Sequence, residues 1–179
     1  MTSPWESSTG AAIRQGDLLV GCPVPLFGAE YATIGLEASG EVGVAPADVL
    51  VVTQSCDLEV RDGKPPKARL VVVRAVHHMA RWIELNPRFK DPKPKEQARR
   101  GEMPAIHLVS APHAPLDNSQ ALAACVHDMY SLPHQFISAH AAGADERWRL
   151  RSPYLEHVSQ ALARFFMRVG LPSDIPRYC

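Results

Sequence analysis

The sequence predicts a mainly β protein with some α-helix, built as a small antiparallel barrel or sandwich with an amphipathic helix at its C-terminus. Three observations point to this class. Short aliphatic runs of strand length recur along most of the chain, sixteen prolines punctuate it, and only its last part shows a long helical period. The 179 residues predict a single domain, with a barrel core over about 13–132 and a helical region over about 133–179.

Five segments are predicted as strands because each is short, rich in aliphatic residues and bounded by glycine, proline or polar residues. Two of them contain uninterrupted aliphatic runs, which are typical of strands buried in a core. Clustered prolines are expected to interrupt regular structure, because proline lacks an amide donor. The predicted strands cover residues 17–22, 49–54, 68–76, 105–109 and 123–130, and the proline clusters lie at 23–25, 65–66, 87–94, 112–115 and 172–176.

Caps and an apolar stripe predict the C-terminal helix. Ser152 is expected to cap it, with Pro153 at the first helical position and a later Gly-Leu-Pro sequence at its end. Two shorter helices are considered over 133–142 and over 91–100, the second with a loop as the alternative. The stripe has the spacing of one helix face and consists of Leu155, Val158, Leu162, Phe165, Phe166 and Val169.

Charge and composition narrow the possible functions. Nineteen basic residues balance nineteen acidic ones, so the chain lacks the strong positive field that non-specific nucleic-acid binding requires, although a local basic patch is compatible with this balance. The N-terminus has no charged leader followed by an apolar run, and no apolar stretch reaches the roughly 18 residues of a membrane span. The sequence therefore predicts a cytoplasmic protein that does not enter a membrane.

The cysteines and histidines do not form a recognisable metal motif. No C-x-x-C, H-x-x-x-H or H-E-x-x-H spacing occurs, so we expect no metal and no cofactor. Cys56 follows a predicted core strand and is a candidate nucleophile if a histidine such as His77 or His127 lies within hydrogen-bond reach. The alternative is a small, half-buried cysteine beside a turn made by Asp57.

Further candidates for proton transfer lie near the ends of two predicted strands. His77 and His78 directly follow the third aliphatic run, and Arg81 comes shortly after them. Asp128 precedes Tyr130 by two residues, and strand alternation places these two side chains on one face. The alternative is an edge strand in which the aspartate caps the following turn.

Residues 87–100 form the basic patch of the sequence. Phe89 and the nearby Trp82 are candidates for stacking on a base, which would make this segment a nucleic-acid contact. A solvated, proline-rich loop is the alternative. The basic residues of the patch are Arg88, Lys90, Lys93, Lys95, Arg99 and Arg100.

The polar face of the predicted C-terminal helix carries Arg164 and Arg168, which are four residues apart. One interpretation is a solvated face, and the other is contact with an anion or a partner. Phe165 and Phe166 project about 100° apart on a helix, so one can fill the core while the other, with Phe166 as our candidate, meets a partner.

Several short segments, in chain order, together carry a resemblance to a known family. They are Gly16-Asp-Leu-Leu19, Ala47-Asp-Val-Leu-Val-Val-Thr-Gln-Ser55, Arg69-Leu-Val-Val-Val-Arg-Ala-Val76, Pro104-Ala-Ile-His-Leu-Val109 and Asp128-Met-Tyr-Ser-Leu132. Over roughly residues 13–135 the chain resembles the MazF/PemK toxin superfamily. The resemblance implies an SH3-like antiparallel barrel, endoribonuclease chemistry and a role in a toxin–antitoxin or similar bacterial conflict system.

The chain also departs from that family. Residues 23–48 contain no arginine or lysine where family members that cut RNA have an arginine, and no serine or threonine directly follows the third strand. The charged side chains of residues 23–48 are all acidic, and an acidic loop repels a phosphate backbone. We therefore expect a non-catalytic binding module that contacts a protein partner, an RNA or a second copy of itself. The alternative is an endoribonuclease whose acid–base site has moved to His77, His78, Arg81 and Asp128.

Overall fold

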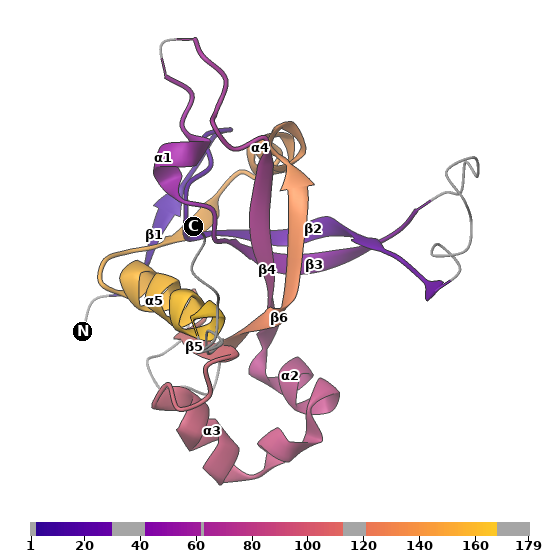
Figure 1. The fold of residues 1–179 in the computed structure, drawn as a ribbon, viewed down its shortest axis with the longest axis vertical. Coiled ribbons are helices and arrows are strands. Elements are labelled where there is room, and N and C mark those ends of the chain that lie inside the picture. Colours follow the sequence, from indigo (N-terminus) through magenta and orange to yellow (C-terminus); the bar gives the residue numbers. More distant parts are fainter. Residues whose placement is uncertain (1–2, 30–41, 62, 113–120, 168–179) are drawn as a thin grey trace, which may run out of the picture.

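The computed structural model describes residues 3–29, 42–61, 63–112 and 121–167, which build a seven-stranded antiparallel sheet flanked by helices (Figure 1). The prediction of an antiparallel sheet followed by a C-terminal helix is confirmed. The strand order is β1-β7-β2-β3-β4-β6-β5. The strands are β1 (Trp5–Ser8), β2 (Asp17–Leu26), β3 (Gly43–Val51), β4 (Leu70–His78), β5 (Ile106–Ser110), β6 (Ala121–Pro133) and β7 (Arg147–Leu150).

The sheet does not close into a barrel, so the prediction of a closed SH3-like barrel is wrong. The edge strands are β1 and β5, and no backbone ladder joins them among the described residues. A side chain of one edge reaches the other, because the indole Nε1 of Trp5 donates to the carbonyl oxygen of Ser110 at 2.6 Å. The edges therefore approach each other without the continuous hydrogen-bonded register that a barrel needs.

Prolines do not end the β2–β3 ribbon, contrary to expectation for the 23–25 cluster. Pro23 pairs with Pro46 across the ribbon, and β2 continues through Pro25 to Leu26. Beyond Cys22, β2 has no partner except β3 in the described part of the chain, so each strand has an open side there. Proline is tolerated on such an edge because no ladder hydrogen bond is required on the open side.

The two faces of the sheet bury different residues, as strand alternation requires. One face packs against α1 (Ser55–Leu58) and α4 (His134–Ala142) around Val49, Val51 and Ile137. The other face packs against α5 (Tyr154–Phe166) around Leu50 and Val158. The predicted helix over 133–142 is thus confirmed as α4.

The start of α5 differs from the expected cap. Pro153, not Ser152, occupies the N-cap position, and it provides no side-chain hydrogen bond there. Val158 is buried and Leu155 is half-buried. Gly16, the first residue of the Gly16–Leu19 segment, has a φ of +86°, and a Cβ atom at this position would lie 2.9 Å from the Leu155 side chain, so only glycine fits there. The predicted end of the helix at 170–172 lies outside the described residues.

An arm of three short helices is inserted between β4 and β5 and is called the helical arm below. It consists of α2 (Met79–Leu85), the 3₁₀ helix η2 (Pro87–Lys90) and α3 (Pro92–Arg99). Asp91 caps α3 by accepting a hydrogen bond from the backbone nitrogen of Lys93 at 2.8 Å, so the helix predicted over 91–100 is confirmed in place of a loop. The arm packs onto β5 and β6 through Trp82, Phe89 and Ala98.

The start of β2 carries a buried ion cluster. Asp17 is fully buried, and its carboxylate accepts hydrogen bonds from Arg147 and Arg149 of the neighbouring strand β7. The backbone nitrogen of Arg14 donates to the same carboxylate at 3.0 Å. Remaining donors of Arg147 bind the backbone carbonyls of residues 10 and 12. Two guanidinium groups thus share one carboxylate, and all three side chains are held by hydrogen bonds.

None of the helices in the described part of the chain has the length and apolar character that a membrane crossing requires.

Candidate functional site

A bulge in β6 shapes the candidate site. β6 pairs with β4 along one edge, both before and after the bulge, and its residues 121–125 also pair with β5 along the other edge. Arg74 of β4 lies opposite Met129, whereas Val76 lies opposite Ala124, so the four residues 125–128 of β6 span the place of Ala75 alone. Because bulges redirect side chains at the edges of functional sites, this segment can present groups that a regular strand would hold apart.

His77 and Asp128 meet beside the bulge. The Nε2 atom of His77 lies 3.4 Å from the Oδ2 atom of Asp128. The imidazole also stacks on the Trp82 indole, with ring centroids 5.7 Å apart and planes inclined by 26°. The two side chains are 22% and 44% exposed, so solvent and ligands can reach the pair. A carboxylate and an aromatic plane that together orient an imidazole suit a proton-transfer role.

A cavity of about 500 Å³, called the His77 cavity below, adjoins this pair. Its size is typical of a small-molecule or substrate site. The helical arm contributes Asn86 and Arg88, and β6 contributes His127 and Tyr130. Asp128 and Tyr130 therefore face one cavity, as strand alternation predicted, although the bulge separates Asp128 from the regular ladder. Two histidines, a carboxylate, a phenol and a guanidinium thus line this one concave surface.

The other proposed members of the acid–base set lie elsewhere. His78 is exposed and occupies the N-cap position of α2. Arg81 is exposed and donates to Glu84 at 2.8 Å. Neither residue lines the His77 cavity. Adjacent strand residues point to opposite faces, which explains why His78 does not join His77.

Cys56 lies in a separate cavity of about 750 Å³. Its Sγ atom is 3.7 Å from the side-chain oxygens of Gln54 and Asp57. Neither His77 nor His127 lines this cavity, but His134 does. The Nε2 atom of His134 is 3.2 Å from the carbonyl oxygen of Leu58, and its Nδ1 atom is 3.4 Å from the hydroxyl of Ser138. Both ring nitrogens are engaged, so no free base faces the thiol within the described residues.

The basic patch is divided between paired and unpaired charges. Arg99 and Arg100 both donate to Glu96, at 2.6 Å and 2.7 Å. These hydrogen bonds lower the pKa of Glu96 to about 2, so it remains ionised at neutral pH. Four cations form no ion pair in the described part of the chain, and they lie on η2 and α3: Arg88, Lys90, Lys93 and Lys95.

The predicted base-stacking residues are part of the core, so that prediction is wrong. Trp82 is 4% exposed and Phe89 is fully buried. Their rings meet edge to face with centroids 5.7 Å apart. They fill the space between the helical arm and β6, because an arm this short has few other large apolar groups to bury.

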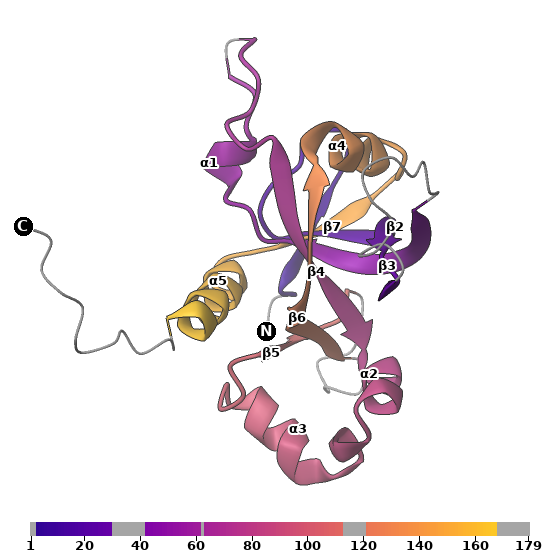
Figure 2. The same ribbon diagram turned by 45° about the vertical axis from the view of Figure 1, so that its right-hand side comes forward.

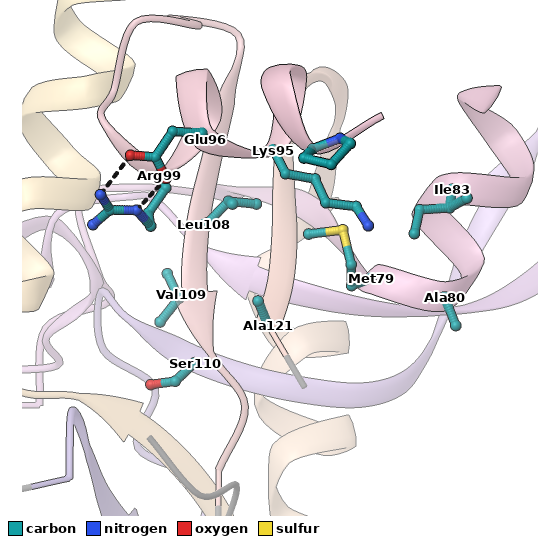
Figure 3. A pocket seen from close by; sticks show the side chains of 11 residues that line it. Met79, Ala80, Ile83, Lys95, Glu96, Arg99, Leu108, Val109, Ser110 and Ala121 are labelled. Atoms are coloured by element: carbon teal, nitrogen blue, oxygen red, sulfur yellow. Dashed lines mark hydrogen bonds and ion pairs between the residues drawn. The ribbon is translucent and has the colours of Figure 1, made fainter. Parts of the chain in front are cut away.

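A further cavity, of about 620 Å³, lies between the helical arm and β5 (Figure 3). Met79, Ile83 and Leu108 give it an apolar interior. Figure 3 shows the Lys95 side chain reaching toward Met79, while Arg99 is joined to Glu96 at the rim. The inside is apolar and the rim is charged, and no acid–base group comparable to His77 and Asp128 is found among its described lining residues.

The predicted partner surface on α5 is exposed where it is described. Phe166 is 57% exposed, and its ring lies edge to face against Phe165, with centroids 5.4 Å apart. Phe165 in turn contacts the His127 ring, with centroids 5.3 Å apart. Arg164 is exposed, and Arg168 lies outside the described residues.

No group of three or more histidine, cysteine, aspartate or glutamate side chains is placed to hold a metal ion within the ranges that the structure describes. Comparison of the chain with protein-family models, with curated proteins and with solved structures finds no match.

Proposed function

We propose that this protein is a nucleic-acid-binding module whose helical arm contacts phosphates. The observation that carries the proposal is a set of four cations on η2 and α3 that form no ion pair among the described residues. One of them, Arg88, lies over the Phe89 ring and also lines the His77 cavity. A strand whose phosphates contact Lys90 and Arg88 would therefore approach His77.

The burial of Trp82 and Phe89 limits the ability of the arm to recognise bases in such a strand. Trp82 and Phe89 are in the core, so the arm offers cations but no aromatic platform. Contacts to phosphates position a nucleic acid without reading its bases. We therefore expect little sequence preference and, for about four phosphate contacts on a single strand, a log–log salt slope of about −3.

Fluorescence anisotropy with a labelled single-stranded RNA at low salt tests this proposal. Changing Lys90, Lys93 and Lys95 together to glutamate should weaken binding at least tenfold and flatten the salt slope. A matched control makes the same charge change at Lys64, Lys67 and Arg69, which are exposed outside the helical arm, and should bind almost as the native chain does. Absence of RNA and DNA binding at low salt, or equal loss in both variants, contradicts the proposal.

A second function, RNA cleavage, is favoured by the contents of the His77 cavity. Asp128 would orient His77 so that it removes the proton from a ribose 2′-hydroxyl. The 2′-oxygen then attacks phosphorus, the bond to the 5′-oxygen breaks, and His127 donates a proton to that leaving oxygen. Arg88 stabilises the charge that develops on the phosphoryl oxygens. The products are a 2′,3′-cyclic phosphate and a 5′-hydroxyl end.

Cleavage is tested with purified protein and with expression in a bacterial host. His77→Ala and Asp128→Asn should each lower cleavage at least a hundredfold and relieve any growth arrest, while His78→Ala, its neighbour outside the cavity, should leave both unchanged. A substrate with 2′-deoxyribose at the cleavage position should stay intact. If the native chain binds RNA and leaves it uncut, the binding module stands and the nuclease is excluded.

The MazF/PemK resemblance belongs to the same proposal. A curled antiparallel sheet whose edges are bridged by Trp5 supports a distant relation to SH3-like barrels, and the open edge strands depart from it. We propose that the sheet resembles a toxin scaffold that binds nucleic acid, and that the basic residues which contact nucleic acid lie on the helical arm in this chain. Phe166 and Arg164 remain the proposed contacts for a protein partner or a second copy.

A further inference from the structure

A second basic cleft, separate from the His77 cavity, lies between α5 and the connector from α3 to β5. It encloses about 370 Å³. Two views show this connector running beside the C-terminal half of α5 (Figure 1 and Figure 2). The end of the basic patch and the polar face of the C-terminal helix thus line one cleft. In the sequence analysis they are separate candidates for ligand or partner contacts.

The polar lining of this cleft is almost entirely basic. Arg99 and Arg100 enter from the end of α3, and Arg164 enters from α5. His107 of β5 and His157 of α5 complete the set, with no aspartate or glutamate among the described lining residues. Three guanidinium groups converging on one hollow favour an anion with several oxygen acceptors, because each can donate two parallel hydrogen bonds.

Glu96 forms ion pairs with two of these arginines, and it leaves some of their donors free. Its carboxylate binds Nε and one terminal nitrogen of Arg99, but only Nε of Arg100. The terminal nitrogens of Arg100 therefore have no partner among the described residues. Arg164 likewise forms no ion pair within the part of the chain that the structure describes. Both residues retain the groups that a ligand oxygen would need.

A buried cation lies close enough to His107, a residue of this cleft, to affect its charge. Arg74 is fully buried, and none of its three guanidinium nitrogens has a hydrogen-bond partner in the described structure. Burial, together with the nearby charges of Arg74 and His157, lowers the pKa of His107 to about 4. His107 is therefore neutral at pH 7, while the charge of Arg74 beside it is uncompensated. An anion bound near His107 would offset that charge.

Apart from Gly101 and the polar Gln160, the remaining lining is apolar and comes from Met103, Pro104, Ile106 and Ala161. A bare phosphate ion would leave this surface and most of the volume unused. We propose that the cleft binds a phosphate monoester of nucleotide size, with its phosphate between Arg99, Arg100 and Arg164 and its less polar body against Met103 and Ala161. This inference goes beyond the proposed function, because it needs neither the lysines of the helical arm nor His77.

Isothermal titration calorimetry of the full chain at neutral pH and low salt tests this inference with 5′-AMP, inorganic phosphate and adenosine as probes. We expect 5′-AMP to bind, inorganic phosphate to bind at least tenfold more weakly, and adenosine not to bind. Arg100→Ala and Arg164→Ala should each weaken 5′-AMP binding at least tenfold. Arg69→Ala removes an exposed arginine outside the cleft and should change nothing.

Three results would overturn the inference: no binding of 5′-AMP, equal binding of 5′-AMP and phosphate, or native affinity in both cleft variants. A double change of Lys90 and Lys93 to glutamate should leave 5′-AMP binding intact while it weakens RNA binding, so the two proposals fail separately. Single-stranded RNA with and without a 5′-phosphate distinguishes the source of the phosphate. A preference for the phosphorylated end indicates a chain terminus, and no preference indicates a free nucleotide.

Discussion

Two buried charged sites in this protein differ in whether their side chains have hydrogen-bond partners. At the start of β2, Asp17 accepts hydrogen bonds from Arg147 and Arg149, and the other donors of Arg147 bind backbone carbonyls. In the middle of β4, Arg74 is equally buried, but its guanidinium has no hydrogen-bond partner among the described residues. Both sites are inside the sheet, and both hold guanidinium groups.

The difference shows what each cluster contributes. The hydrogen-bonded cluster joins β2 to β7 through the side chains of Asp17, Arg147 and Arg149. A buried cation without hydrogen bonds or a counter-ion costs free energy in the isolated chain, and it is tolerable where something else supplies the missing negative charge. Neither Arg74 nor Asp17 lines a cavity described above, but the charge of Arg74 acts on His107, which lines the basic cleft that we assign to a phosphate monoester. Three substitutions test this contrast.

The largest effect is expected at Asp17. Asp17→Asn removes the negative charge and leaves Arg147 and Arg149 without their counter-ion. A buried pair broken in this way typically costs about 3–5 kcal/mol. Urea unfolding measures the loss, with Asp145→Asn, an exposed aspartate, as the control. A loss close to that of the control would mean that the cluster stabilises nothing.

The second effect is a pH dependence centred on His107. Its pKa in the folded state, about 4, lies below the ordinary value of 6.5, chiefly because the ring is buried. The unfolded chain therefore binds a proton between these two pH values while the folded chain does not, so stability falls as pH decreases from 6.5 to about 4. His107→Gln should reduce this fall by up to about 3 kcal/mol.

Unfolding curves at pH 7 and pH 4.5 for the native chain and for His107→Gln test that expectation. The difference between the two proteins should change steadily as the pH decreases, because only the native chain loses stability through this ring. A constant difference would show that the ring titrates at the same pH in the folded and unfolded chain.

The smallest effect, with the opposite sign, is expected at Arg74. Arg74→Met replaces an unpaired guanidinium by an apolar side chain of similar length. Since an unsatisfied buried polar group costs about 1–3 kcal/mol, the variant should be more stable than the native chain without ligand. It should also bind 5′-AMP more weakly, which calorimetry measures. Lower stability than the native chain would show that Arg74 is compensated after all.

Local pattern is enough to predict much of the fold. The aliphatic run predicts the strand β4 and the apolar stripe predicts the helix α5, because burial of their apolar side chains determines each of them. The short strands β1 and β7 are not predictable in this way. Each has four residues and contains polar or charged side chains. β7 also binds the distant Asp17 of β2, a contact that local periodicity does not reveal.

The candidate site is harder to predict from the sequence than the fold is. His77 and Asp128 are both candidates by residue type, but their meeting depends on a bulge inside the apolar run of β6, where no glycine or proline marks it. The place of Asn86 in the His77 cavity depends on α2, which the sequence pattern does not predict. The cleft between Arg100 and Arg164 joins residues far apart in the chain, and only the packing of α5 beside the β5 connector brings them together.

The indole of Trp5 affects how an open edge of the sheet can pair with another strand. An edge strand with unsatisfied carbonyls is a template on which a second chain can add a strand, and sheet proteins need some means to prevent this. Here the N-terminal edge strand places a side chain on a carbonyl of the opposite edge, Ser110. The indole thereby removes one acceptor of the β5 edge from the set that an added strand could use, although the sheet is not closed.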